Sequence, residues 1–178
     1  MAIQLETPRL TLVAFTPAQL ESYVSNLPGL SNELGILLLG NPGQPAVARA
    51  ISLKLDDMKT LGQTGWLWVT YWLIILRQER VGVGLAGFKG PPDAQGQVEM
   101  GYGIDTDYQN KGYMTEAVRC LAGWAFQQPG CRAVNAEVML RNKASVRVLQ
   151  KLGARLVNSD GEKALYRLVP AELVPGKI

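Results

Sequence analysis

The sequence lacks histidine altogether, holds only two cysteines, and has no apolar run long enough to cross a membrane. Without histidine, Ser-His-Asp triads, histidine metal ligands and imidazole acid–base chemistry are excluded. Cys120 and Cys131 cannot build a disulfide framework and lack metal-ligand spacing. The apolar stretch at residues 66–76 is shorter than the roughly 20 residues that a bilayer requires. Glu6 and Arg9 interrupt any early apolar run, so no signal peptide is expected. We expect a cytoplasmic protein with no membrane association and no metal.

The composition is that of one globular domain. Hydrophobic residues make up 47% of the chain and charged residues 19%, which is typical of a folded and not a disordered protein. The net charge of +3 suits an anionic small ligand but is too small to indicate a nucleic-acid partner. No repeat or low-complexity tract is visible. We therefore expect residues 1–178 to form a single domain.

Hydrophobic periodicity predicts alternating strands and helices. The predicted strands cover residues 10–15, 66–76, 81–88, 97–104, 133–140, 155–158 and 163–168. The predicted helices cover residues 17–26, 46–61, 112–128 and 142–152. Leu27-Pro-Gly29 is interpreted as the end of the first helix, and residues 31–43 show no clear pattern. This order predicts an α/β (α+β) domain with a mixed sheet flanked by helices.

Gly82-Val-Gly-Leu-Ala-Gly87 matches the dinucleotide-binding pattern G-x-G-x-x-G. That pattern has physical meaning only where its glycines form the turn between a strand and a helix. Here the glycines lie inside a predicted strand, and Lys89-Gly-Pro-Pro92 follows. We therefore expect a strand face kept bare for close packing, and no nicotinamide or flavin site.

A better phosphate site is Gln109-Asn-Lys-Gly-Tyr-Met114, between a strand ending at Ile104 and an amphipathic helix. Free N–H groups at a helix start point at an anion, and the helix dipole adds roughly half a positive charge. Gly112 permits close backbone approach, and Lys111 supplies a mobile cation. A plain helix start with an exposed lysine would explain the segment equally well.

The preceding strand has one bare face. Alternation places Glu99, Gly101 and Gly103 together, opposite the apolar Val98 and Met100. Two glycines and a carboxylate pack poorly but expose backbone groups to a ligand. The alternative is an exposed sheet edge with a solvated glutamate.

A second helix start carries two polar residues. Asn142 is placed to cap the helix over residues 142–152, and Ser145 lies three positions later. Capping alone explains Asn142. The Ser145 hydroxyl can also face the cleft that the first helix start would border, and Gly153 suits the end of this helix.

Together these segments resemble the GNAT superfamily of N-acetyltransferases, in particular the branch of ribosomal-protein N-terminal acetyltransferases (RimJ/RimL-like). The resemblance is carried by Leu5-Glu-Thr-Pro-Arg-Leu-Thr-Leu12, Val98-Glu-Met-Gly-Tyr-Gly-Ile104, Lys111-Gly-Tyr-Met-Thr-Glu-Ala117 and Asn142-Lys-Ala-Ser-Val-Arg-Val-Leu-Gln-Lys-Leu-Gly153. Residues 27–65 carry no match. The resemblance implies a GNAT-type, largely antiparallel twisted sheet of roughly seven strands with about four helices.

The resemblance also implies acetyl-CoA as cosubstrate. The pyrophosphate would bind at the first helix start, the pantetheine arm along the bare strand, and the thiol end near the second helix start. The implied coenzyme-binding residues are Tyr102, Gly103, Ile104, Gln109, Asn110, Lys111, Gly112, Tyr113, Met114, Asn142 and Ser145. The family usually has Gly or Ala at the position of Met114, whose bulk would reshape the pocket behind the phosphates.

Acetyl transfer needs a neutral amine, a stabilised oxyanion and a proton for the thiolate. Backbone N–H groups around Gly103 are candidates for polarising the thioester. Glu99 is the candidate base, acting through water, with Glu137 in reserve. Ser145 is the first candidate acid, and Tyr166 the second because GNAT enzymes often use a tyrosine.

The sequence says least about the molecule that accepts the acetyl group. We expect a primary amine, from a peptide N-terminus or a small molecule, attacking directly in a ternary complex. The alternatives are a non-catalytic acetyl-CoA-binding module and an antibiotic or polyamine acetyltransferase. Trp66, Trp68 and Trp72 alternate on the predicted strand, which favours core packing over substrate stacking. An exposed aromatic face there would instead mark a homodimer contact.

Overall fold

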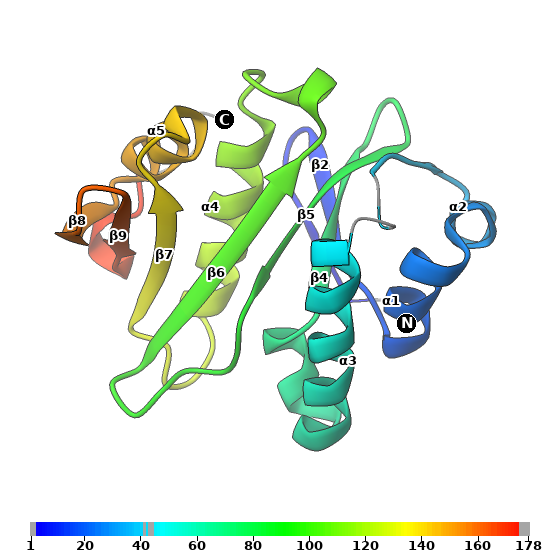
Figure 1. Cartoon of the computed structure of the whole chain (residues 1–178), viewed down its shortest axis with the longest axis horizontal. Coiled ribbons are helices and arrows are strands. Elements are labelled where there is room, and N and C mark those ends of the chain that lie inside the picture. Colours follow the sequence, from blue (N-terminus) through cyan, green and yellow to red (C-terminus); the bar gives the residue numbers. More distant parts are fainter. Residues whose placement is uncertain (1–2, 41, 43–44, 175–178) are drawn as a thin grey trace.

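The computed structural model describes residues 3–40, 42 and 45–174, which fold around one twisted sheet (Figure 1). Its strand order is β1-β2-β4-β5-β6-β7-β9-β8, with β3 paired to β5. Most neighbours are antiparallel, while β6–β7 and β3–β5 are parallel. The strands are β1 (Gln4–Glu6), β2 (Leu10–Ala14), β3 (Leu37–Leu38), β4 (Tyr71–Leu76), β5 (Val81–Phe88), β6 (Gln97–Ile104), β7 (Ala133–Met139), β8 (Arg155–Ser159) and β9 (Lys163–Leu168).

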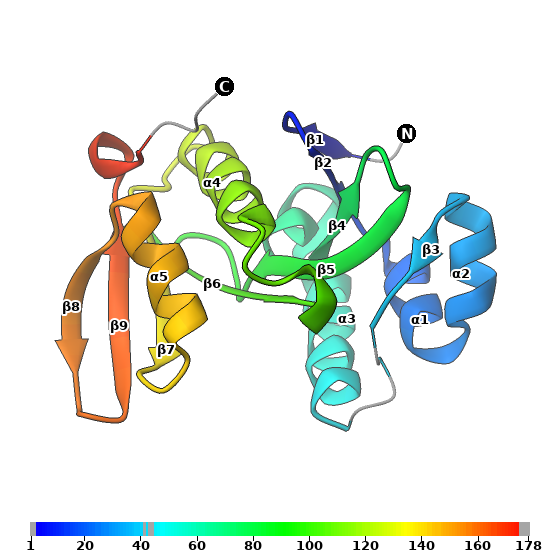
Figure 2. The same cartoon turned by 90° about the horizontal axis from the view of Figure 1, so that it is seen from above.

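Helices cover both faces of this sheet. They are α1 (Pro17–Ser25), α2 (Leu27–Leu34), α3 (Pro45–Gly65), α4 (Tyr113–Phe126) and α5 (Lys143–Leu152). In Figures 1 and 2, α3 lies on one side of β6 and α4 on the other. Successive side chains of a strand point to opposite faces of the sheet, and each face has its own hydrophobic core. Trp72 lies in the core with residues of α4 and α5, and Leu73 lies in the core with residues of α1 to α3. None of the described helices is both long and apolar enough to cross a membrane.

The predicted fold class is confirmed, and the main differences lie before residue 70. Leu27-Pro-Gly29 begins a helix and does not end one, because the Asn26 side chain caps α2 by accepting a hydrogen bond from the Gly29 N–H at 3.1 Å. Proline is well tolerated in a first helical turn, where its missing N–H would have no partner anyway. The short strands β1 and β3 were not predicted as strands.

The prediction of a strand from residue 66 is wrong for its first residues. Helix α3 continues to Gly65, with a kink at Gly62 (φ 63°), and Trp66–Trp68 form a short 3-10 helix before β4. The tryptophans still serve the core, as expected. Trp68 and Trp72 are buried, and their rings lie 4.9 and 5.3 Å from that of Trp124 on α4.

The glycine pattern within residues 82–87 lies in β5, so it forms no phosphate-binding turn. Its glycines allow close backbone packing, as predicted. A Cβ at Gly84 would collide with the Gly103 carbonyl oxygen of β6, and one at Gly87 would lie 2.6 Å from the Thr70 carbonyl oxygen. The bare positions therefore let neighbouring strands approach.

The pairing of β6 with its two neighbours differs along its length. Its last residues, Met100 to Ile104, pair with β5. On its other edge only Gln97, Val98 and Glu99 pair with β7, although both strands continue. Beyond Glu99 the two parallel strands separate (Figure 1), and the free edge of β6 faces the opening. This opening positions the candidate site.

Candidate active site

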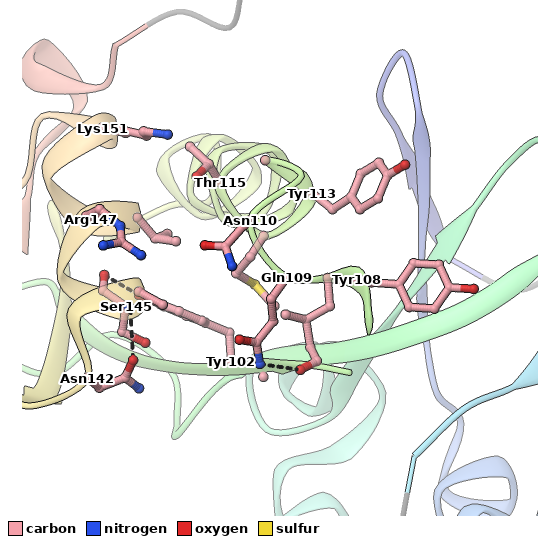
Figure 3. Close-up of a pocket in the computed structure, with 16 residues that line it drawn as sticks. Tyr102, Tyr108, Gln109, Asn110, Tyr113, Thr115, Asn142, Ser145, Arg147 and Lys151 are labelled. Carbon is pink, nitrogen blue, oxygen red and sulfur yellow. Dashed lines mark hydrogen bonds between the residues drawn. The ribbon is translucent and has the colours of Figure 1, made fainter. Parts of the chain in front are cut away.

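A cavity of about 240 Å³ lies where β6, α4 and α5 meet (Figure 3). Residues from three separate sequence motifs line it, which brings together every predicted coenzyme-binding residue except Lys111. They are Tyr102, Gly103, Ile104, Gln109, Asn110, Gly112, Tyr113, Met114, Asn142 and Ser145. The Lys111 ammonium instead lies over the Tyr108 ring, 5.0 Å from its centroid.

The start of α4 leaves its backbone donors open. Gly112 precedes the helix with φ 82°, and no side chain among the described residues caps the first turn. The first N–H groups of an α-helix have no partner within the helix, so they are available to an anion at this position. Asn110 also has a positive φ of 61°, which turns the loop sharply before the helix. The geometry is that of an anion-binding turn.

Met114 lies below this turn and is buried, although it also borders the cavity. It packs in the core shared with α4 and α5. The Met114 side chain therefore forms part of the cavity wall beneath the loop at residues 109–112, and a smaller residue here would leave a larger cavity.

The start of α5 is capped by the side chain of the residue that precedes it, Asn142. The Asn142 carboxamide oxygen accepts a hydrogen bond from the Ser145 N–H at 3.1 Å, which caps the helix as predicted. The Tyr102 hydroxyl donates to the Ser145 carbonyl oxygen at 3.4 Å (Figure 3). Burial raises the pKa of Tyr102 to about 12, so its hydroxyl keeps its proton at neutral pH.

The bare face of β6 is open, as predicted. Gly101 and Gly103 are exposed, and a Cβ at either position would have no described atom within 4 Å. Glu99 lies on the same face, at the point where β6 leaves β7. Backbone groups of this strand are therefore accessible from the side opposite α4.

Three of the predicted catalytic candidates do not border the cavity. The Glu99 carboxylate forms an ion pair with the Lys89 ammonium. Glu137 pairs with Lys163 at 2.9 Å. Tyr166, on β9, is buried in the core and only 7% exposed. Ser145 is the predicted catalytic residue that the structure places at the cavity.

Two basic residues at the cavity were not predicted. Arg147 and Lys151 lie one turn apart on α5 and border the same space as the open start of α4 (Figure 3). Arg147 and Lys151 are four positions apart in the helix that follows Asn142, and residues so spaced share a helix face. This spacing in the sequence could have indicated that both face the same side as the helix start. Together with the α4 N–H groups they make this end of the cavity suited to negative charge.

The fold thus combines a mixed sheet that opens between the parallel strands β6 and β7 with the start of α4 at the same opening. The model of the acetyltransferase (GNAT) domain matches residues 9–155 of the chain. The chain therefore belongs to the GNAT family of N-acetyltransferases, whose members use acetyl-CoA.

Curated N-acetyltransferases are similar to the chain in sequence, including two from Bacillus species. The uncharacterized N-acetyltransferase YjdG of Bacillus subtilis (strain 168) is 32% identical over 91 residues, which cover 51% of this chain and 54% of the relative. The uncharacterized N-acetyltransferase p20 of Bacillus licheniformis is 27% identical over 124 residues, covering 68% and 67%. The match to YjdG thus spans about half of that relative's length.

Solved structures share the fold at low sequence identity. The ribosomal L7/L12 alpha-N-protein acetyltransferase RimL, in complex with coenzyme A, has a TM-score of 0.67 at 15% identity, over 94% of this chain and 98% of that one. A GNAT-family acetyltransferase from Bacillus anthracis has a TM-score of 0.62 at 20% identity, over 96% and 100%. The GNAT-type architecture expected from the sequence is therefore confirmed.

Proposed function

We propose that this chain transfers the acetyl group of acetyl-CoA to a primary amine, by direct attack in a ternary complex. One observation carries the proposal: the open start of α4 and the unpaired edge of β6 border one cavity. Acetyl-CoA combines a pyrophosphate with an extended amide-bearing arm, and the open helix start and the unpaired strand edge match these two parts. RimL, a protein of the same fold, binds coenzyme A.

In this proposal the pyrophosphate accepts hydrogen bonds from the backbone around Gly112, with Arg147 and Lys151 adding positive charge. The amides of the pantetheine arm pair with the free edge of β6 near Tyr102 and Ile104, in the way an added strand would. Both interactions use groups that the fold leaves without strand or helix partners. The thioester then lies between β6 and the start of α5.

The amine nitrogen attacks the thioester carbon, the N–C bond forms, and the C–S bond breaks as the tetrahedral oxyanion collapses. Backbone N–H groups near Gly103 stabilise that oxyanion. Ser145 gives a proton to the leaving thiolate and regains one from solvent, and the Tyr102 hydroxyl is the second candidate because it keeps its proton and lies beside Ser145. A thiol has a reference pKa near 8.5, so the acid contributes modestly.

The acceptor approaches from the bare face of β6. Glu99 lies there and takes the proton of the amine through a water molecule. For this the Glu99 carboxylate must leave its ion pair with Lys89 and accept a hydrogen bond from that water. A peptide N-terminus and a small-molecule amine both satisfy this arrangement. RimL acts on a protein N-terminus, which favours the peptide.

The test is to incubate the protein with acetyl-CoA and a panel of peptide and small-molecule amines, and to measure free thiol and acetylated product. Thiol release that depends on an amine supports the proposal, and the preferred amine identifies the acceptor class. Acetyl-CoA binding without thiol release on any amine would favour a non-catalytic binding module. Absence of binding would refute both.

A further inference from the structure

The turn between β1 and β2 contacts the candidate phosphate loop, although the two lie far apart in sequence. Glu116, in the first turn of α4, accepts hydrogen bonds from Thr7 Oγ1 at 2.6 Å, from the Arg9 backbone N–H at 3.0 Å and from Arg9 Nε at 2.7 Å. The Glu116 side chain is only 15% exposed. Its carboxylate is therefore fully engaged by two residues of this turn and is held in place.

Arg9 reaches past Glu116 to the loop itself. Its Nη1 donates to the Lys111 carbonyl oxygen at 3.1 Å. In a trans peptide the C=O of one residue and the N–H of the next point in opposite directions. Holding the Lys111 carbonyl on the Arg9 side therefore aims the Gly112 N–H away from Arg9, and Gly112 borders the cavity.

Arg9 also packs against the residues that follow. Its guanidinium carbon lies 4.6 Å from the centroid of the Tyr113 ring. A Cβ at Gly112 would lie 3.3 Å from Arg9 Nη2, so the arginine rests close against the bare glycine. One side chain thus contacts Lys111, Tyr113 and Glu116 and lies beside Gly112, at the end of the loop and the first turn of α4.

We propose that Arg9 is a positioning residue for the acetyl-CoA pyrophosphate: with Thr7 and Glu116 it fixes the Lys111–Gly112 peptide so that the Gly112 N–H is aimed before the cosubstrate arrives. This rests on the proposed function, since it assumes that acetyl-CoA binds at this loop. It gives a role to Thr7-Pro-Arg9, a segment that borders no part of the proposed acetyl-transfer cavity.

The test compares two acetyl donors in four variants. Acetyl-CoA carries the pyrophosphate, and S-acetyl-pantetheine lacks it. The variants are Arg9→Ala, Arg9→Lys, Glu116→Gln and the control Arg77→Ala. Arg77 donates to the Thr7 carbonyl oxygen at 3.0 Å and pairs with Glu6 at 3.7 Å, and none of its hydrogen bonds or ion pairs within the described residues reaches the loop. It therefore controls for the loss of one positive charge beside the turn.

Arg9→Ala is expected to weaken acetyl-CoA binding about tenfold in calorimetry, because a hydrogen bond to a charged group contributes about that factor. The kcat with saturating acetyl-CoA and the kcat/KM for acetyl-pantetheine should stay near wild type. Glu116→Gln should follow Arg9→Ala, and Arg9→Lys should stay weakened, because an ammonium lacks the fork that reaches Glu116 and the Lys111 carbonyl together. Arg77→Ala should bind as wild type does.

Several outcomes would overturn the inference. Unchanged acetyl-CoA affinity in the Arg9 variants would do so, as would an equal loss for both donors, which would mean general structural damage. Full rescue by Arg9→Lys would show that charge alone suffices. If Arg9→Ala fails to fold, Arg9→Lys carries the comparison. Wild-type protein that binds no acetyl-CoA would instead refute the proposed function together with this inference.

Discussion

Two helices begin at the same cavity, and they begin in different ways. Helix α5 is capped by Asn142, whose side chain occupies the Ser145 N–H. Helix α4 follows Gly112 and has no side-chain cap. The helix dipole is similar in both, so the difference lies in whether the chain satisfies its own first-turn donors. The open start can hold an external anion, whereas the capped start presents a hydroxyl and a fixed backbone.

The comparison separates binding from chemistry within one cavity. The open start of α4 is contacted from outside the helix by Arg9, which bonds to Glu116 and to the Lys111 carbonyl oxygen, and we propose that these contacts hold the loop in shape. A capped start is rigid by itself and can hold Ser145 in place. Changes at α4 should therefore alter cosubstrate affinity, and changes at α5 should alter turnover or stability.

The largest effect is expected from distorting the open start of α4 with Gly112→Ala. The left-handed φ of 82° costs an alanine roughly 1–2 kcal/mol, and its Cβ would press on Arg9. The loop should relax to another shape, and the acetyl-CoA dissociation constant should rise about thirtyfold. Gly123→Ala on the same helix, where a Cβ meets open space, is the matched control. Equal affinity in both variants would contradict the assignment of the loop.

Turnover should respond to Ser145→Ala. Loss of the proposed acid is expected to lower kcat about tenfold, while the acetyl-CoA dissociation constant stays near that of the wild type, because the backbone N–H that Asn142 caps is retained. Stopped assays of thiol release and calorimetry measure the two quantities. Wild-type turnover would remove Ser145 from the mechanism and leave Tyr102 as the remaining candidate at the cavity.

A smaller effect is expected from removing the cap itself. Asn142→Ala should lower the free energy of unfolding by about 1 kcal/mol, the usual contribution of an N-cap. The affinity for acetyl-CoA should change by less than about threefold, because the pyrophosphate is proposed to bind at α4. Urea denaturation and calorimetry on one preparation test this. A large loss of affinity with little loss of stability would place the coenzyme at α5 instead.

The smallest expected effect is a pH dependence at the brace of α4. Desolvation raises the pKa of Glu116, but the hydrogen bonds from Thr7 and Arg9 outweigh it and hold that pKa below its usual value. A depressed carboxyl pKa contributes stability at neutral pH that is lost as the pH falls through it. The stability advantage of wild type over Glu116→Gln should therefore shrink on acidification, as measured by urea denaturation. A constant difference would mean that Glu116 is not the titrating group.

The sequence predicts what depends on local chemistry. The turn at Gly112, the cap at Asn142, the glycine after α5 and the bare face of β6 follow from residue type and spacing alone. Leu27-Pro-Gly29 was misread because proline serves a helix start as well as a helix end, and the Asn26 cap decides between them. Trp66 was misplaced because aromatic residues suit both a strand and a buried turn.

Other features depend on partners that local patterns do not specify. The pairing of Glu99 with Lys89 arises only when β5 and β6 are joined. Arg147 and Lys151 face the cavity because α5 packs beside α4. The contact of Arg9 with Glu116 joins two motifs that were each recognised separately, and nothing in either motif states that they touch.

The separation of 107 positions between Arg9 and Glu116 bears on how the protein folds. Closing a chain segment of that length costs entropy, so we expect this contact to form after much of the intervening chain is ordered. On this view the loop before α4 reaches its final shape once β1 and β2 have joined the sheet beside β4. Acquisition of acetyl-CoA binding during refolding should therefore report the joining of the two ends of this segment, after most secondary structure has formed.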